Sequence, residues 1–308
     1  MKIYNGLETF KKNKPVVLTT GTFDGVHQGH LAIIDQLKSH AKKIGGETVV
    51  LTFFPHPRMV LYPENNDLRL INTIEERKAL LEKAGVEHLI IHPFSKAFAQ
   101  LSSLDFVRNI LVNQIDVNTL VVGYDHHFGK NREGSFEDLK EYGEIYDFKV
   151  EEIPAQEVQQ VNISSTKIRN SLIEGEINAA NQFLGYPYTI NGTVIEGDKV
   201  GRTIGFPTAN IKVDEWYKLI PANGVYAVKV ILNKQEYKGM LNIGMRPTLN
   251  GKMQTIEVNI FNFNENIYNK AIQIQFYERI RSEQKFEELV ALKKQLTIDK
   301  EKTLQLLN

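Results

Sequence analysis

Residues 14–30 read KPVVLTTGTFDGVHQGH, and this stretch decides the fold of the first half of the chain. Residues 14–20 (KPVVLTT), with the apolar run VVL at their centre, predict a buried strand. Residues 27–44 predict a helix, because apolar side chains recur there at helical spacing: Leu31, Ile34, Leu37 and Ala41. A glycine-containing turn joins the two. The chain therefore opens with a strand, a turn and a helix.

The same alternation continues outward along the first half. Three more apolar runs predict buried strands: residues 48–53, 88–92 and 119–122. Residues 72–84 predict a helix that begins with a capping box of Thr73 and Glu76 and ends before Gly85. Another helix is expected around residues 104–112. This order predicts an α/β domain with a parallel sheet and helices on both faces. Such sheets bind ligands at the carboxyl ends of their strands.

The pattern changes in the second half. Residues 165–174 and 176–183 predict two helices that close the first domain. Short β-rich runs follow: residues 189–196, 224–232, 237–244, 254–261 and 271–280. Helical spacing returns at residues 286–296. These features predict a small antiparallel β-barrel with a C-terminal helix. We place the domains at residues 1–184 and 185–308.

Composition limits the classes of function. The 37 basic and 37 acidic side chains balance, which argues against a nucleic-acid binder held mainly by phosphate contacts, although a local basic groove stays open. The chain has no cysteine, which excludes disulfides, thiolate nucleophiles and cysteine-based zinc sites. The polar N-terminus and the short apolar runs predict a cytoplasmic protein with no membrane partner. All eight histidines precede residue 128, so only a site in the first half can use imidazole.

The turn at residues 21–30 carries the first candidate site. Its glycines let the backbone approach a ligand closely, and the helix start offers N–H groups and a positive dipole end to a phosphate. His27 and His30 are one helical turn apart, so both imidazoles project toward one place, and Gly29 leaves room beside them. Such a pair can donate hydrogen bonds to a transferring phosphoryl group and a departing pyrophosphate. The simpler alternative is a helix start with two solvated histidines.

Two further segments are placed to join this site. Residues 52–57 (TFFPHP) end the second strand, where Phe54 offers an aromatic surface to a planar ring; the alternative is a rigid turn with an exposed His56. Residues 163–169 (ISSTKIR) set three hydroxyls at a helix start, with Arg169 one turn on. N-capping explains one hydroxyl, whereas three hydroxyls and an arginine fit phosphate contacts.

GTFDGVHQGH, TFFPHP and ISSTKIR, in this order and spacing, resemble the adenylyltransferase module of prokaryotic bifunctional riboflavin kinase/FAD synthetases. The resemblance implies a Rossmann-like nucleotidyltransferase domain in which the FMN phosphate attacks the α-phosphorus of ATP and pyrophosphate leaves, without a covalent enzyme intermediate. It implies that His27, His30 and Arg169 are catalytic. It places these residues on the nucleotide: Gly21, Phe23, Asp24, Gly29, Ser164, Ser165 and Thr166. It places these residues on the flavin: Phe54, His56 and Asp125.

One segment of this module departs from the family pattern. In residues 123–129 (GYDHHFG), His126 occupies the position where an aromatic residue usually follows the acidic or amide one. His126 and His127 are adjacent, and neighbours on an extended chain point in opposite directions. This argues against a metal ion shared by the two. The contact that His126 makes is left open.

The second candidate site lies in residues 192–210 (GTVIEGDKVGRTIGFPTAN). The segment predicts a flexible, positively charged flap without the Gly-Lys-Ser/Thr of a Walker A loop, and its backbone N–H groups can wrap phosphates. The residues assigned to the nucleotide are Gly197, Lys199, Gly201, Arg202, Gly205, Pro207, Thr208 and Asn210. Thr208 and Asn210 point the same way on an extended strand and are the candidate Mg²⁺ ligands. The alternative is a glycine-rich hairpin with a polar rim.

GRTIGFPTAN resembles the signature of riboflavin kinases, a family of small six-stranded barrels, and residues 224–227 and 242–248 match its next two segments. The resemblance implies that the 5′-hydroxyl of riboflavin attacks the γ-phosphorus of ATP, with Mg²⁺ on the nucleotide. It implies that Glu257 orients or deprotonates that hydroxyl. A carboxylate is the expected base because the second half has no histidine.

Three further positions follow from this second resemblance. Asn259 stands where the family has a histidine, a position that we interpret as supportive. Arg279 and Arg281 lie where the family closes over the flavin, so both are assigned to flavin binding.

Together the motifs predict a bifunctional enzyme that uses ATP and Mg²⁺ to convert riboflavin to FMN and FMN to FAD, releasing ADP and pyrophosphate. Two alternatives stay open: only one module is active, or the same folds serve as a non-catalytic flavin or nucleotide sensor. The pair of His27 and His30 and the carboxylate of Glu257 argue against a sensor, because a sensor needs no base. The sequence makes no prediction of the oligomeric state.

Overall fold

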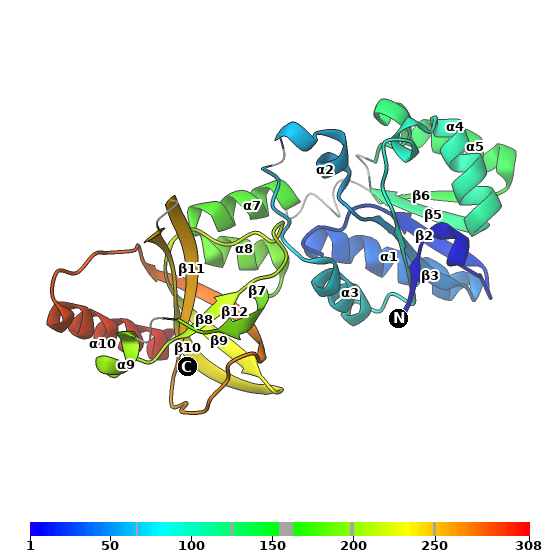
Figure 1. Cartoon of the computed structure of the whole chain (residues 1–308). Coiled ribbons are helices and arrows are strands. Elements are labelled where there is room, and N and C mark those ends of the chain that lie inside the picture. The colour runs from blue at the N-terminus through cyan, green and yellow to red at the C-terminus, as the bar shows by residue number, and fades with distance from the viewer. Residues whose placement is uncertain (66, 124–125, 154–162, 198–199, 249–250) are drawn as a thin grey trace. The chain divides into compact units, whose positions relative to one another are not determined.

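The computed structural model describes residues 1–65, 67–123, 126–153, 163–197, 200–248 and 251–308. They form two compact units, residues 1–165 and 166–308. The first is a parallel sheet with helices and the second is a closed β-barrel with helices (Figure 1). The predicted fold class is therefore confirmed for both halves. The domain boundary that we place from the sequence, between residues 184 and 185, stays a prediction.

The sheet of the first unit has six parallel strands in the order β1-β4-β3-β2-β5-β6. Their bounds are Lys2–Asn5 (β1), Val16–Thr20 (β2), Glu47–Phe53 (β3), His88–His92 (β4), Val117–Gly123 (β5) and Lys149–Ile153 (β6). The inner strands are near-continuous apolar runs because side chains pack on both faces. The edge strands β1 and β6 are more polar, and the sequence analysis missed them for this reason.

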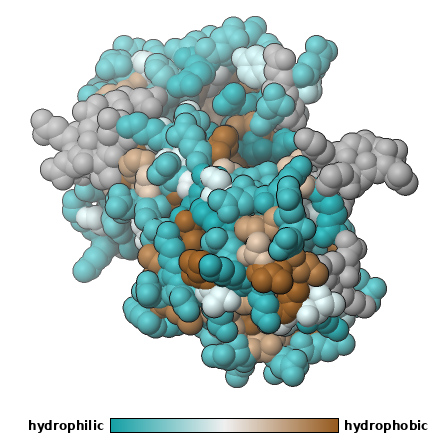
Figure 2. All heavy atoms as spheres, turned by 90° about the vertical axis from the view of Figure 1, so that its left-hand side faces the viewer, coloured by the Kyte–Doolittle hydropathy of each residue, from teal (hydrophilic) through white to brown (hydrophobic). Residues whose placement is uncertain are grey.

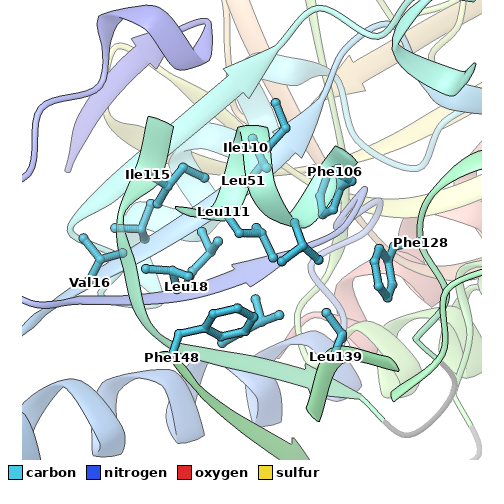
Figure 3. Packing of buried hydrophobic residues seen from close by; sticks show 14 of the residues in the cluster. Val16, Leu18, Leu51, Phe106, Ile110, Leu111, Ile115, Phe128, Leu139 and Phe148 are labelled. Carbon is cyan, nitrogen blue, oxygen red and sulfur yellow. The ribbon is translucent and has the colours of Figure 1, made fainter. Parts of the chain in front are cut away.

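Helices cover both faces of this sheet. On one face, α1 (Gln28–Ile44) and α3 (Ile74–Lys83) pack against alternate strand residues such as Val17 and Val50. On the other face lie the π-helix η4 (Phe106–Ile115) and α5 (Phe136–Tyr146), whose Phe106, Ile110, Leu111, Ile115 and Leu139 pack with Val16, Leu18 and Leu51 (Figure 3). The shorter helical segments are η1 (Leu7–Thr9), α2 (Pro57–Leu61), η2 (Pro63–Asn65), η3 (Phe98–Gln100), α4 (Ser103–Asp105) and η5 (Lys130–Arg132).

The second unit is a closed antiparallel barrel in the order β10-β11-β8-β7-β12-β9. Its strands are Tyr188–Ile195 (β7), Ala209–Lys212 (β8), Gly224–Leu232 (β9), Gln235–Thr248 (β10), Gly251–Ile260 (β11) and Ala271–Arg281 (β12). Three of its helices are α7 (Ser165–Glu174), α8 (Ile177–Leu184) and α9 (Val200–Thr203). The aromatic rings of Tyr188, Tyr226 and Phe276 are fully buried and contact one another through Phe276. Burial raises the pKa of Tyr226 to about 12, so its hydroxyl stays protonated and donates to the carbonyl of Ala222.

The C-terminal helix α10 (Leu289–Leu306) is anchored to the barrel by a buried ion pair. Arg281 donates from both Nε and Nη2 to the carboxylate of Asp299, which is 1 % exposed. Figure 2 shows hydrophobic side chains among hydrophilic ones on a face that includes this unit. On α10 the exposed large hydrophobic side chains are Leu289, Val290, Ile298 and Leu306. Within the described ranges, no helix is both long and apolar enough to cross a membrane.

Candidate active sites

The turn between β2 and α1 has an unusual backbone. Phe23, Gly25 and Val26 all have positive φ, at 48°, 93° and 34°. Positive φ is costly for a β-branched residue such as Val26, and such strain persists only where the surroundings hold it in place. The turn ends at His27, which caps the N-terminus of α1. The strained turn therefore places this histidine at the start of the helix.

The imidazoles of His27 and His30 are stacked, with ring centroids 3.7 Å apart and an interplanar angle of 18°. The backbone N–H of His30 donates to Nδ1 of His27 at 3.4 Å. The predicted convergence of the two side chains is thus seen in the structure. Gly29, which precedes His30 in the sequence, is buried. The ring of Phe23 packs against that of His30, with the two centroids 4.9 Å apart.

His30 is held as a neutral imidazole. Burial, the neighbouring His27 and the charge of Arg77, in that order, lower the pKa of His30 well below its usual value. Its Nδ1 is buried and has no hydrogen-bond partner among the residues that the structure describes. A buried nitrogen of this kind at a helix N-terminus is suited to a phosphate ligand.

Asp24 lies inside the protein. Its carboxylate is fully buried and accepts the backbone N–H groups of Ile71 and Asn72, both at 3.2 Å. Nη2 of Arg77 is 4.0 Å from the same carboxylate. The structure therefore places this predicted nucleotide-binding residue among groups that hold the turn.

The segment ISSTKIR reaches the turn through one described contact. The hydroxyl of Ser165 donates to the backbone carbonyl of Asp24 at 2.9 Å. Ser164 is exposed immediately before it, whereas Thr166 and Arg169 belong to α7 in the second compact unit. The hydroxyl of Ser165 therefore contacts the turn of the first site.

An aromatic cavity of about 920 Å³ opens at the carboxyl ends of β2, β3 and β5. The phenylalanines that line it are Phe53, Phe94, Phe98, Phe106 and Phe128, and Phe98 contacts the rings of Phe53, Phe94 and Phe106. Gly21 and Thr22 also line it, so the cavity and the histidine pair share one turn. We call this space the aromatic cavity. Sequence reasoning missed it, because its rings come from separate segments.

The predicted flavin residues fall differently around this cavity. His56 lines it and caps α2 by accepting the N–H of Arg58 at 3.2 Å. Phe54 instead packs against the buried cluster beneath α1 and α3, and its neighbour Phe53 faces the cavity. Asp125 lies outside the described residues.

His126 lines the aromatic cavity. Its ring lies nearly parallel to that of Phe128, with an interplanar angle of 16° and centroids 6.1 Å apart. His126 lines the cavity together with His127 and the cationic Arg58 and Arg132. An aromatic wall beside positive charge suits a planar ring that carries a phosphate.

The second site is centred on Glu257 of β11. Its Oε1 accepts a hydrogen bond from Nη2 of Arg246 at 3.1 Å, and its Oε2 accepts one from the hydroxyl of Thr208 at 3.2 Å. Asn210 of β8 is paired directly with Glu257 across the strands. The barrel thus brings together three of the predicted residues, and it adds Arg246, to which sequence reasoning gave no role.

The flap before β8 is built for close backbone approach. A side chain at Gly201 would collide with the carbonyl of Phe206, and one at Gly197 with the amide of Asn210. Gly205 has a φ of 85°, which favours glycine. Asn259 donates to the carbonyl of Pro207 at 2.6 Å, so its side chain supports the flap. Lys199 lies outside the described residues.

A second cavity of about 480 Å³ lies beside this flap in the barrel unit. Arg202, Pro207 and Thr208 line it, opposite the loop of residues 263–268. We call it the barrel cavity. The loop carried no motif, so the sequence analysis did not single it out.

Arg279 and Arg281, both predicted to bind flavin, make contacts within the protein. Arg279 donates to the carbonyls of Asn223 at 2.5 Å and Glu174 at 3.4 Å, so it ties the end of α7 to the start of β9. Arg281 holds Asp299 of α10, as described above. These contacts give both arginines a structural role.

No group of three His, Asp or Glu side chains gathers to hold a metal ion in the described part of the chain. The donor set near Glu257 is a carboxylate, a hydroxyl and an amide, the oxygen ligands that Mg²⁺ prefers. Mg²⁺ commonly takes one or two protein ligands and completes its shell with phosphates and water. This set therefore fits a metal ion that arrives with a nucleotide.

Comparison with known proteins gives matches to both units. The family model for FAD synthetase matches residues 9–167, and that for riboflavin kinase matches residues 184–307. Curated relatives described as bifunctional riboflavin kinase/FMN adenylyltransferase include those of Listeria monocytogenes (43% identical, over 93% of this chain and 91% of that one) and Bacillus subtilis (39%, over 94% and 92%). A solved structure described as a macrolide-efflux protein from Streptococcus pneumoniae is 34% identical, covers 98% of each chain and superposes with a TM-score of 0.90.

Proposed function

The chain belongs to the family of bifunctional riboflavin kinases/FMN adenylyltransferases, and we propose which of its residues carry each reaction. The barrel unit phosphorylates riboflavin with ATP, giving FMN and ADP. The parallel-sheet unit transfers AMP from ATP to FMN, giving FAD and pyrophosphate. Both reactions move a phosphorus group between oxygens, so positioning and charge neutralisation account for most of the catalysis.

The stacked pair of His27 and His30 at the start of α1 is the observation that carries the adenylyl-transfer proposal. An oxygen of the FMN phosphate attacks the α-phosphorus of ATP, and the bond to the β-phosphate breaks as pyrophosphate leaves with the electron pair. The two imidazoles and the N–H groups of the helix start stabilise the charge that develops. From the motif ISSTKIR alone, Ser164, Thr166 and Arg169 are proposed as further phosphate-binding residues.

The aromatic cavity is the proposed flavin site of the same reaction. Its volume of about 920 Å³ and its wall of phenylalanine rings suit the planar isoalloxazine. His56 and His126 line it, and the turn that carries the histidine pair forms its edge. FMN bound there would present its phosphate toward that turn.

Replacing Phe98 by alanine tests this placement. We expect the KM for FMN in FAD synthesis to rise about tenfold, since stacking on one aromatic ring contributes about 1–3 kcal/mol. FAD formation from FMN and ATP gives the measurement. Phe263→Ala, the same change at the barrel cavity, is the matched control and should leave this KM unaltered. An unchanged KM in Phe98→Ala would place the flavin elsewhere.

In the barrel unit we propose Glu257 as the base. The 5′-oxygen of riboflavin forms a bond to the γ-phosphorus of ATP, the bond from that phosphorus to the β-phosphate oxygen breaks, and the hydroxyl proton passes to Glu257. Arg246 and Thr208 hold the two oxygens of this carboxylate in place. Thr208 and Asn210 are the proposed Mg²⁺ ligands, and the metal would neutralise phosphate charge when bound.

A two-step turnover assay tests the whole assignment. Purified protein supplied with riboflavin, ATP and Mg²⁺ should form FMN and then FAD, resolved by chromatography. FMN supplied without riboflavin should yield FAD directly, which separates the two units. Excess EDTA should stop both reactions if Mg²⁺ is the metal that accompanies ATP. Absence of both products under complete conditions would refute the proposal.

A cytoplasmic location is likewise proposed from the sequence.

A further inference from the structure

Arg77 is the largest fully buried side chain in the described part of the protein, at 1 % exposure. It lies on α3, whose start is fixed by the capping box of Thr73 and Glu76. A buried guanidinium is costly unless it is paired, so its position calls for a partner of opposite charge. That partner is Asp24, whose carboxylate is fully buried 4.0 Å from Nη2.

The contacts of Arg77 reach two points of the strained turn. One is Asp24 itself. The other is Thr22, because Nη1 of Arg77 donates to the hydroxyl of Thr52 at 3.5 Å, and this hydroxyl donates to the carbonyl of Thr22 at 3.2 Å. The residues between and after these points include Phe23 and Val26, whose positive φ must be held by their surroundings.

We propose that Arg77 is a positioning residue for adenylyl transfer, which holds the turn that carries His27 and His30 through its buried ion pair with Asp24. The inference rests on the proposed role of His30. Arg77 touches neither substrate in this scheme. Its effect passes through the geometry of the turn and through the charge that it presents to the histidine pair.

The charges near His30 predict in which direction its pKa should shift in each variant. Arg77 and His27 act to lower the pKa of His30, and burial acts in the same direction. The carboxylate of Asp24 lies 4.0 Å from Nη2 of Arg77, so we expect its negative charge to offset part of the effect of that guanidinium on His30. Removing the guanidinium while Asp24 stays should therefore raise the pKa of His30, and removing the carboxylate while Arg77 stays should lower it. A residue that only fills space would produce neither shift.

The test measures kcat/KM for FAD formation from FMN and ATP against pH in the full-length chain. We expect Arg77→Met to lower this value about 100-fold at neutral pH, the effect of displacing catalytic groups by about 1 Å. The acidic limb of the pH profile should move to higher pH in Arg77→Met and to lower pH in Asp24→Asn. Arg77→Lys, which keeps the charge, should leave the limb where it is and recover most of the rate. Riboflavin phosphorylation in the same samples should not change, because the barrel unit carries it.

The outcomes separate this inference from the proposed function. If Arg77→Met formed FAD at the wild-type rate with an unshifted acidic limb in its pH profile, while His30→Ala was inactive, only the role of Arg77 would be overturned. A fully active His30→Ala would overturn the role of His30 and, with it, this inference. A lowered rate in Arg77→Met with an unmoved limb and no recovery in Arg77→Lys would reduce Arg77 to a structural residue. If Arg77→Met does not fold, Asp24→Asn decides, because an unmoved limb there contradicts the proposal.

Discussion

Glu257→Gln is expected to lower riboflavin phosphorylation by about 10³-fold, within the range that a positioned general base supplies. The amide keeps the size of the side chain but cannot take the proton of the 5′-hydroxyl. It also replaces one carboxylate oxygen that accepts from Arg246 or Thr208. FAD formation from supplied FMN should keep its wild-type rate, since the parallel-sheet unit performs it. Chromatography of both reactions on one preparation gives the measurement.

Glu236→Gln is the matched control for this prediction. Glu236 lies on β10 of the same barrel, where it pairs with Lys229 at the surface. An exposed pair contributes about 0–1 kcal/mol, so its loss should alter neither reaction. Wild-type phosphorylation in Glu257→Gln would show that Glu257 is not the base. Equal loss of both reactions in a folded Glu257→Gln protein would contradict two separate sites.

Much of the fold was predictable because buried strands and capped helices leave local signals. The apolar runs of β2, β3, β4 and β5 and the capping box of α3 appear in the structure as predicted. The helix expected around residues 104–112 is a π-helix over Phe106–Ile115, a difference that apolar spacing alone does not resolve. β1 and β6 were missed, since edge strands face solvent and lack a continuous apolar run.

The same distinction applies to the candidate sites: residues with a local sequence signal were predictable, and those brought together only by packing were not. His27 and His30 were predictable because residues three apart on a helix are neighbours. Arg77 was not, since a basic residue in the run EERK reads as part of a solvated helix face, although its spacing from Ile74 and Leu81 sets it on the apolar side. The aromatic cavity was not predictable either. Its walls meet only after the β-strands are paired, and no local pattern encodes that pairing.

Asp24 and Phe54 lie in segments that border the site, and the structure shows where their side chains pack. Both lie in segments that the family resemblance singled out, and the turn and strand end that contain them do border the site. Their side chains nevertheless face inward, Asp24 toward Arg77 and Phe54 toward the cluster beneath α1. A motif records that a segment is constrained, whereas packing decides which of its side chains meet the ligand.

His30→Ala is expected to lower FAD formation by about 10³-fold, the cost of removing a group that stabilises developing charge. The loss should appear in kcat, because the imidazole acts most strongly on the pyrophosphate as it leaves. Riboflavin phosphorylation should be unchanged, which also shows that the chain is folded in its second unit. His27→Asn should have a similar effect while preserving a side chain that can cap α1. Rates of FAD and FMN formation on the same preparations give the comparison.

His40→Ala makes the same chemical change on the same helix and is the control. His40 lies near the far end of α1, half-buried, with its Nδ1 3.9 Å from Glu151, and nothing places it near the turn. It should therefore form FAD at close to the wild-type rate. If His30→Ala did so as well, the stacked imidazoles would be a packing feature of the helix start, and the negative charge of the departing pyrophosphate would have to be met by the backbone N–H groups and the cationic side chains alone.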